Sequence, residues 1–563
     1  MNIINIKKVD CENCYKCVRS CPLKAIRIKK QHAEVVEERC ILDGKCVAVC
    51  PHNAKEIEDG LNRIKELLAS KFKVIVSLAP SFAGLFDLKH PGQMVSALHK
   101  LGFAEVEETA WAAEMVATEH IKMLETLPKP VLTSSCPAIV GLVEIYYPEL
   151  IPHLARVVSP MIAHGRMLKA DHTEDMRVVF IGPCIAKKKE MVDVPGAIDG
   201  VLTFVELKEW FEEEHINIGS LAEEEFANES PKWARLFPLE GGLLKTASIN
   251  PDMLSREVLV ISGVEECKEF LKDFGKNIPQ KVNIIEMLAC PEGCINGPGI
   301  KTEYSLLARR QKILGFSKDN EGISIPIKKF KEVDLSRSYA DRRITPLIPT
   351  DEDIGGLLSS IGKFTPEDET NCGACGYDSC REKAVAVYQG MAEIEMCIPY
   401  MRTKAESMSE IITESIPSGV IVVAEDMTIL DINAAARELF SCQKRKLIGN
   451  KLNTIIDDNY FRKAFSEQNV ISGEVSYPGY ELIFQQTILF VPKHNIAVGI
   501  FIDITKQQRH IKEEERRKES FSRAHTVINK QMRVAQEIAG LLGETTAETK
   551  ASLLELLKLM EGK

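Results

Sequence analysis

The 563-residue sequence has no apolar run near the ~18 residues that a membrane-spanning helix needs. Residues Met1 to Lys16 are polar and reach cysteines too early for a secretory signal, so we expect no signal peptide and no membrane partner. The chain also lacks a strong charge excess, because its net charge of −10 gives no reason to expect nucleic-acid binding. These absences predict a cytoplasmic protein.

Disulfides are a further expected absence. The chain has 17 cysteines, but the cytoplasm keeps thiols reduced and these cysteines stand in tight groups, so metal binding is the better interpretation. Only Cys267 and Cys442 lie outside the groups, and we expect them to be buried small apolar residues. The chain is also too long for one hydrophobic core, which predicts several folded units in series.

The first cysteine group repeats one spacing twice. The first run is Cys11-x2-Cys14-x2-Cys17-x3-Cys21-Pro22, which places three thiolates around one cubane cluster and sends the fourth toward a neighbour. The second run is Cys40-x2-Asp43-x2-Cys46-x3-Cys50-Pro51, with Asp43 where a cysteine would stand. Zinc knuckles, the alternative, need two paired ligand sets instead of two interleaved runs.

This repeat resembles the bacterial two-cluster ferredoxins. The resemblance implies one cluster held by Cys11, Cys14, Cys17 and Cys50, and another held by Cys21, Cys40 and Cys46. Asp43 would bind the fourth iron of the second cluster, or leave it water-bound to give a labile [3Fe-4S] cluster, because oxygen binds iron–sulfide cores less tenaciously than thiolate. We therefore interpret residues 1–56 as an electron port.

Residues from about Lys71 onward alternate short apolar runs, such as 74–78 and 178–181, with helical patterns, which predicts an α/β domain with buried strands. Its cysteines stand in three short segments: Cys136, Cys184, and the pair Cys290 and Cys294. Two of these segments follow strand-like runs, where loops at strand ends gather ligands into a site. Four simply buried cysteines are the alternative.

Residues 133–137, 182–190 and 286–294 resemble, in this order, the three cysteine motifs of the [FeFe]-hydrogenase H-cluster domain, and the likeness extends over residues 75–299. It implies a [4Fe-4S] cluster on Cys136, Cys184, Cys290 and Cys294, with Cys294 bridging to a diiron subsite with CO and cyanide ligands. Further contacts to that subsite would come from Ala79, Pro80, Ser81 and Pro183. Lys187 would donate to one of its diatomic ligands.

The sequence departs from the hydrogenase pattern where protons are delivered. Active members have a cysteine at the place of Ser135, and a hydroxyl is a far poorer acid than a thiol, whose pKa of ~8.5 lies near neutrality. Ser135, Lys187 and Glu190 are the candidate catalytic side chains, and we expect slow turnover. For Lys187 and Glu190 the alternative is an ordinary charged helix face.

The pocket expected around the diiron subsite is also lined differently. Gly182 and Leu288 replace two methionines, and residues 295–299 read Ile-Asn-Gly-Pro-Gly instead of a run of glycines. A cubane cluster without a diiron subsite is therefore an alternative, as in the eukaryotic relatives that use this fold for cluster assembly.

A second cluster motif follows a breaker-rich connector, residues 337–369, in which we expect one short helix near residues 354–361. Its cysteines are Cys372, Cys375, Cys380 and Cys397, and small residues between them let the loop wrap a metal centre closely. The motif resembles the small four-cysteine [4Fe-4S] domain of corrinoid proteins and electron-transport subunits. Zinc is the alternative.

The sequence after Met408 changes character. It shows strand-like runs, Asn433 as an N-cap for a helix at residues 434–440, and a last run that ends in Asp503-Ile504-Thr505. This resembles a PAS domain, in which such a strand leads into an output helix. The tail has apolar residues at helical spacing, which favours a dimer seam or docking face. We find no kinase ATP motif or helix-turn-helix, so a separate signalling output protein is expected.

The sequence thus predicts a multidomain α/β protein in five parts. These are a ferredoxin-like α+β domain (1–56), an H-cluster α/β domain (57–345), a small four-cysteine [4Fe-4S] domain (350–404), a PAS α+β domain (408–505) and C-terminal helices (506–563).

We interpret it as a hydrogen- or redox-sensing member of the [FeFe]-hydrogenase family that exchanges electrons with electron-transfer proteins. The alternatives are a slow hydrogenase that interconverts protons and H2, and a multi-cluster electron carrier without a diiron site.

Overall fold

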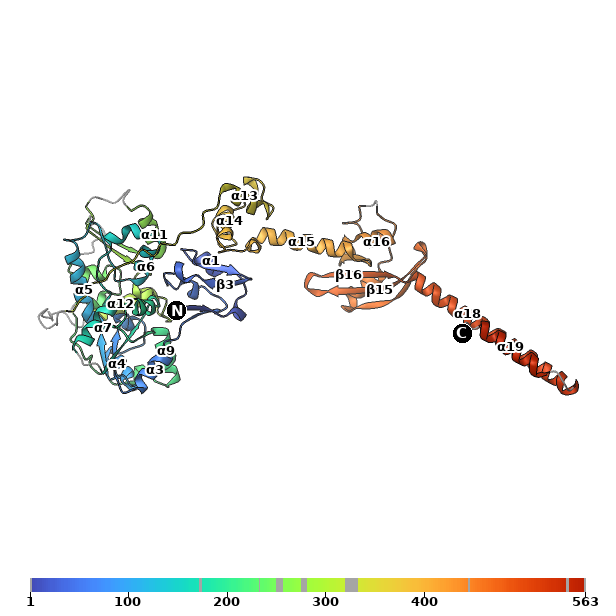
Figure 1. The fold of residues 1–563 in the computed structure, drawn as a ribbon, viewed down its shortest axis with the longest axis horizontal. Helices are drawn as coiled ribbons and strands as arrows, with labels where there is room; N and C mark the ends of the chain where they lie inside the picture. Colours follow the sequence, from blue (N-terminus) through green and yellow to red (C-terminus); the bar gives the residue numbers. More distant parts are fainter. Residues whose placement is uncertain are drawn as a thin grey trace. The chain divides into compact units, whose positions relative to one another are not determined.

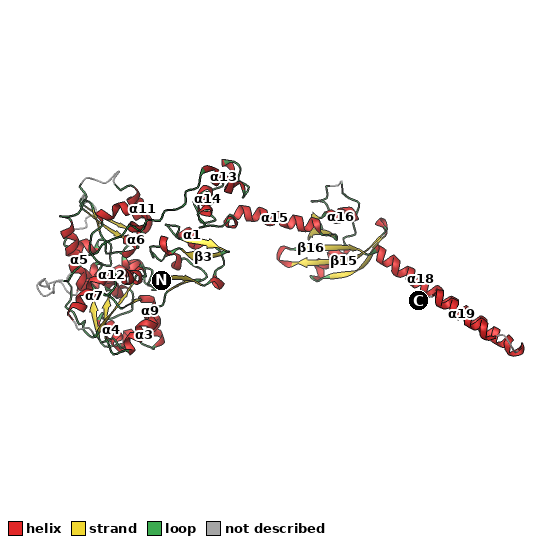
Figure 2. Cartoon of the chain, in the orientation of Figure 1, coloured by secondary structure: helices red, strands yellow, loops and turns green. Residues whose placement is uncertain are grey.

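The computed structural model describes residues 3–171, 175–231, 233–249, 257–274, 281–318, 333–443, 446–542 and 546–560. The chain divides into two compact units, Met1–Tyr400 and Met401–Lys563. Figure 1 follows the chain through both units, and Figure 2 shows their helices and strands. Within the described ranges, no helix combines the length and the apolar character that crossing a bilayer requires.

The first part of the chain folds as two similar halves. β1 (Ile4–Ile6) pairs antiparallel with β4 (Lys55–Ile57), and β2 (Ile26–Lys29) pairs antiparallel with β3 (His32–Val35). Each half has a cysteine loop that runs into a short helix, α1 (Lys16–Ser20) or α2 (Lys45–Ala48). Tyr15 and Gly44, the residues before these helices, have φ of 56° and 73°, so both loops turn sharply at the same point of the repeat.

Four parallel strands form the first sheet of the central region, in the order β6-β5-β8-β9. Their bounds are β5 (Lys73–Leu78), β6 (Glu105–Glu108), β8 (Met176–Gly182) and β9 (Gly200–Thr203). The apolar runs of β5, β8 and β9 are buried, as a parallel sheet covered by helices requires. The helices next to these strands in the chain are α3 (Leu61–Ala69), α4 (Gly92–Lys100), α5 (Ala110–Met123), α7 (Pro160–Asp171), α8 (Ala186–Asp193) and α9 (Phe204–Glu213).

A separate parallel sheet has the order β10-β11-β7. Its strands are β7 (Val131–Leu132), β10 (Val258–Ser262) and β11 (Ile284–Leu288). The helices of this part are α6 (Pro137–Tyr146), α10 (Gly242–Thr246), α11 (Val264–Lys272) and α12 (Leu306–Lys318). The central region is therefore α/β, as the sequence predicts, but it is built on two sheets.

The second cysteine motif stands between short helices. α13 (Asp351–Ser359) begins before the expected position, because Thr350 and Asp353 form a capping box at its start. α14 (Cys380–Tyr388) begins at a cysteine, and α15 (Ile398–Ser415) begins directly after Cys397. One apolar cluster joins this motif, the amino-terminal halves and the second sheet, with Ile26, Ile285 and Met391 among its buried members.

The second unit contains a five-stranded antiparallel sheet in the order β13-β12-β16-β15-β14. The strands are β12 (Gly419–Ala424), β13 (Ile429–Ile432), β14 (Ile471–Tyr477), β15 (Leu482–Val491) and β16 (Ile496–Asp503). Its helices are α16 (Ala434–Leu439), α17 (Asn459–Glu467), α18 (Thr505–Leu542) and α19 (Thr546–Met560). Asn433 caps α16 as predicted, since its Oδ1 accepts the Ala436 N–H at 2.9 Å.

Candidate functional site: the cysteine clusters

The carboxyl ends of four parallel strands supply the segments that the sequence singled out in the central region. β5 and β8, in the first sheet, end before Ala79 and Pro183. β7 and β11, in the second sheet, end shortly before Cys136 and Cys290. All three cysteine segments therefore follow strands. The sequence missed β7, because a strand of two residues shows no alternation.

The four cysteines of these segments lie within electrostatic reach of one another. Burial raises the pKa of Cys184 to about 11 and that of Cys294 to about 12, and Cys136 adds to both shifts. Burial likewise raises the pKa of Cys290 well above its ordinary value, with contributions from Cys184, Cys294 and Cys136. Buried thiols of this kind become thiolates when a metal centre supplies the compensating positive charge.

A cavity opens beside these cysteines, with about 530 Å³ of empty space including its mouth. Its wall is mostly apolar, and it is lined by Cys184, Cys294, Ser135 and Lys187 together with Ala79, Pro80, Ser81 and Pro183. The structure thus brings together the candidate residues Ala79, Pro80, Ser81, Pro183, Ser135 and Lys187. Glu190, Gly182, Leu288 and residues 295–299, which the sequence also placed at this pocket, are not among the residues that line it. The hydroxyls of Ser81 and Ser135 are buried and have no hydrogen-bond partner in the described part of the chain.

Glu190 lies behind the cavity and is fully buried. Its carboxylate accepts hydrogen bonds from Lys187 at 2.7 Å, Ser159 at 2.8 Å and Arg337 at 2.8 Å. Burial raises the pKa of Glu190, but the two cations and the hydrogen bonds outweigh burial and hold the pKa below its ordinary value. Lys187 and Glu190 are therefore a buried ion pair and not an exposed charged face.

The cysteines of the ferredoxin-like repeat also gather. A cavity is lined by Cys11, Cys14, Cys17 and Cys50, which are the four ligands expected for the first cluster. Cys21, Cys40, Cys46 and Asp43 form the other group, since burial raises the pKa of Cys46 and the charges of the other three raise it further. Burial also raises the pKa of Asp43 to about 6, and its Oδ2 has no partner among the described residues.

The four cysteines of the last motif form a fourth group. Burial raises the pKa of Cys375, and Cys397 and Cys372 raise it further. Lys383 lies within reach of Cys397, Cys375 and Cys380, and burial lowers its pKa against the effect of these thiols. No three His, Cys, Asp or Glu side chains in the described ranges converge on one point as ligands of a single ion would. Cubane ligands instead bind the separate irons of a cluster.

Contacts connect the three parts of the chain that carry these cysteine groups. In the second ferredoxin loop, a β-carbon at Gly44 would lie 2.2 Å from Cβ of Pro298, so this loop packs directly on the segment after Cys294. On the other side, Arg19 donates to the carbonyl of Ala374 at 2.8 Å and Lys24 donates to that of Gly376 at 2.7 Å. The ferredoxin-like part therefore lies between the other two cysteine groups.

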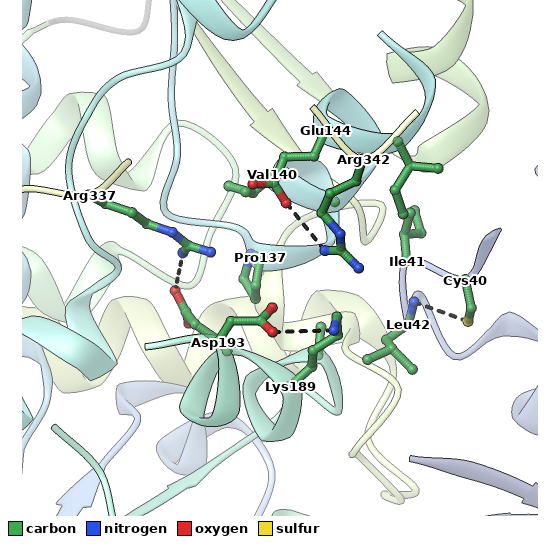
Figure 3. Close-up of a pocket in the computed structure, with 14 residues that line it drawn as sticks. Cys40, Ile41, Leu42, Pro137, Val140, Glu144, Lys189, Asp193, Arg337 and Arg342 are labelled. Carbon is green, nitrogen blue, oxygen red and sulfur yellow. Dashed lines mark hydrogen bonds and ion pairs between the residues drawn. The ribbon is translucent and has the colours of Figure 1, made fainter. Parts of the chain in front are cut away.

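Figure 3 shows the junction on the central side. The loop with Cys40 faces helices α6 and α8, which begin next to Cys136 and Cys184, across a shared cavity. Arg342 binds Glu144 at the rim, and Lys189 binds Asp193.

Several buried polar atoms without a hydrogen-bond partner lie at these cysteine groups. Within the described ranges they are atoms of Asn13, Asp43, Lys55, Ser81, Ser135 and Tyr377. Buried polar groups are nearly always satisfied, so unpartnered atoms beside clustered thiols fit sites shaped around bound inorganic groups. The residues present fit iron–sulfur clusters at all four groups.

Cys267 and Cys442, which lie outside these groups, are 0% and 3% exposed, which confirms their interpretation as buried residues. Arg337, Ser159 and Lys55 also take part in these sites but were not predicted from the sequence. Of these, only Lys55 had a signal in the sequence, because the equivalent residue of the other half of the repeat is the apolar Ile26.

Four family models match the chain. Residues 72–298 match the iron-only hydrogenase large subunit, C-terminal domain. Residues 3–51 match a 4Fe-4S dicluster domain, residues 368–399 an Fe-S cluster domain, and residues 408–481 the PAS fold.

Several curated proteins are similar to part of the chain. The NADP-reducing hydrogenase subunit HndD of Solidesulfovibrio fructosivorans is 27% identical over 49% of this chain and 58% of its own length. The periplasmic [Fe] hydrogenase large subunit of Nitratidesulfovibrio vulgaris is 27% identical over 53% of this chain and 86% of its own length. The probable cytosolic Fe-S cluster assembly factor oxy-4 of Caenorhabditis elegans is 23% identical over 57% of this chain and 83% of its own length.

Fold, cysteine groups and similarities together define an iron–sulfur protein with a hydrogenase-like domain and a PAS domain. The chain spans less than two thirds of the first of these relatives. The PAS match lies in the second unit, outside the hydrogenase-like domain.

Proposed function

We propose that this protein senses hydrogen or redox state through a cluster site in its hydrogenase-like domain and reports that state through its PAS domain. The observation that carries the proposal is the apolar cavity beside Cys294, which is lined by Lys187 and by Ser81 and Ser135, whose hydroxyls have no partner among the described residues. An apolar cavity with a few convergent polar groups is the usual form of a small-ligand site.

The cavity residues suit a diiron subsite with diatomic ligands. The Lys187 ammonium has three N–H donors and Glu190 uses one of them, so the others remain for a ligand in the cavity. The buried carboxylate also fixes the position of the ammonium. When bound, the diiron group would supply the reversible chemistry between H2, protons and electrons beside the [4Fe-4S] cluster that Cys136, Cys184, Cys290 and Cys294 would hold.

Proton delivery would be slow in this protein. Ser135 lines the cavity next to Cys136 and its hydroxyl has no partner among the described residues. A hydroxyl gives up a proton far less readily than a thiol, so the relay would limit turnover. Slow turnover suits a reporter, which needs to change state and hold it.

The contacts between the cysteine groups support one electron route. It runs from the four-cysteine cluster through the two ferredoxin clusters to the cluster on Cys136, Cys184, Cys290 and Cys294, because the ferredoxin-like part contacts both other groups. Together with external electron-transfer proteins, this route would set the redox state of the sensing site.

The second unit would carry the signal onward. α15 begins directly after Cys397 and ends at Ser415, where Asn433 of the PAS fold donates to the carbonyl of Thr413 at 2.9 Å. Side chains of α18 such as Val527, Val534 and Ile538 are half exposed. We propose that they form the seam of a homodimer and that a separate cytoplasmic protein receives the output. We also propose that the five domains have the limits that the sequence predicts.

Infrared spectroscopy tests the proposal. Protein prepared without oxygen and matured with a diiron precursor should show metal-bound CO and cyanide bands that change under H2. Responsive bands combined with slow hydrogen turnover would support sensing, whereas fast turnover would favour the enzyme. Intact cubane clusters without such bands would refute the proposal that this protein senses hydrogen. That result would favour a multi-cluster electron carrier without a diiron site.

A further inference from the structure

Lys55 is a buried lysine in the ferredoxin-like part. It stands at the start of β4 and is only 7% exposed. Its Nζ has no hydrogen-bond partner in the described part of the chain. An ammonium removed from water without a partner costs several kcal/mol, so a buried lysine of this kind requires a compensating negative charge nearby.

The internal repeat of the domain has an apolar residue at the position equivalent to Lys55. Cys21-Pro22 is followed after two residues by Ala25 and Ile26, and Cys50-Pro51 is followed after two residues by Ala54 and Lys55. Ile26 is 1% exposed and packs in the apolar core. The second half of the repeat carries a cation at the equivalent position instead.

The surroundings of Lys55 are the two ferredoxin cysteine groups. Lys55 lines the cavity formed by Cys11, Cys14, Cys17 and Cys50. Burial raises the pKa of Cys17 and of Cys46, and Lys55 opposes the rise at both thiols, one from each group. The ammonium therefore lies within electrostatic reach of both groups and directly at the first.

We propose that Lys55 is the charge-compensating residue of the cluster held by Cys11, Cys14, Cys17 and Cys50, and that it raises the reduction potential of this cluster. Reduction adds one negative charge to a cluster, and a nearby ammonium in a poorly hydrated site stabilises the reduced form more than the oxidised form. The effect extends more weakly to the second cluster. The consequence is that an arriving electron stays on the first cluster, which becomes the storage point of the relay.

This inference rests on the proposed ferredoxin clusters, so the test uses the full-length, cluster-loaded protein. Midpoint potentials are measured by titration under argon with electron paramagnetic resonance, after Cys14→Ser has identified the signal of the first cluster. Lys55→Met and Lys55→Gln remove the charge, and Lys55→Arg keeps it. Lys8→Met removes the same charge from an exposed position of the same domain, where solvent screens it.

Both neutral variants should lower the reduced-to-oxidised ratio of the first cluster about tenfold or more at a fixed potential, a shift of about 59 mV for one electron. Lys55→Arg and Lys8→Met should stay close to the parent. Equal potentials in parent and neutral variants overturn the proposal, and so does an equal shift in Lys55→Arg. Loss of the cluster from both neutral variants but not from Lys55→Arg assigns Lys55 a structural role and also overturns it. Absence of ferredoxin clusters from the parent would instead refute the proposed cofactors.

Discussion

Replacing Glu190 by Gln should destabilise the hydrogenase-like domain strongly. Glutamine keeps the shape of the side chain but removes the charge that holds Lys187 at 2.7 Å and Arg337 at 2.8 Å in a buried site. Removing the charge of one partner of a buried ion pair lowers the free energy of unfolding by about 3–5 kcal/mol, because the remaining charges stay buried and uncompensated. With an m-value of up to about 3 kcal/mol per M urea, the unfolding midpoint should fall by at least about 1 M.

Tryptophan fluorescence can follow this transition without interference from other domains. The chain has 3 tryptophans, and Trp111, Trp210 and Trp233 all lie within the hydrogenase-like region. Asp193→Asn is the matched control on the same helix, since Asp193 pairs with Lys189 at 3.3 Å and its side chain is 35% exposed. Exposed pairs contribute about 1 kcal/mol or less. Equal midpoints for the two variants would refute the role given to Glu190.

The stability difference between the parent protein and Glu190→Gln should depend on pH. The pKa of Glu190 lies below its ordinary value of about 4.3 in the folded protein, because Lys187, Arg337 and its hydrogen bonds outweigh the effect of burial. Its stabilisation is therefore complete above the unfolded pKa and is lost as pH falls through the folded pKa. The difference between parent and variant should be constant near neutrality and should shrink only in acid below about pH 4. A difference that shrinks near neutrality would contradict the ion-pair assignment.

Ser135→Cys should raise hydrogen–deuterium exchange of the matured protein by on the order of a hundredfold, and no gain would count against the relay argument. Asp43→Cys should give the second cluster a full thiolate set, so the resonance of an oxidised three-iron cluster should be absent from the variant and present in the parent. Gly44→Ala places a side chain at φ +73° and against Pro298, which costs about 1–2 kcal/mol of backbone strain and disturbs the contact between the ferredoxin loop and the central domain. In rapid-mixing experiments the central cluster should therefore be reduced more slowly, whereas the ferredoxin clusters should be reduced at the parent rate. Asn433→Ala removes a side chain that bonds Val420, Ala436 and Thr413, and should lower PAS-domain stability in calorimetry by about 2–3 kcal/mol.

Local spacing indicated the cysteines of each ferredoxin run and of the last motif, whereas the resemblance to two-cluster ferredoxins assigned Cys50 and Cys21 to the cluster of the other run. The two runs that end at Cys21 and Cys50 and the motif from Cys372 to Cys380 lie within short loops, so their ligands are close in any compact conformation. Hydrophobic periodicity likewise indicated the α/β character of the central region, and Asn433 marked the start of a helix. These signals depend on neighbours in the chain, and that is why they can be read from it.

Only the tertiary structure decided which distant residues act together. Glu190 and Arg337 are 147 residues apart, and no local pattern pairs them. The segments at Cys136 and Cys290 follow strands of one sheet, and the segment at Cys184 follows a strand of the other. This arrangement depends on pairing between strands that are far apart in the sequence. The burial of Lys55 against both ferredoxin groups likewise depends on how the two halves pack. Chain spacing specifies ligands within a loop, whereas packing specifies the charges and cavities around them, because these arise from contacts that the linear order does not contain.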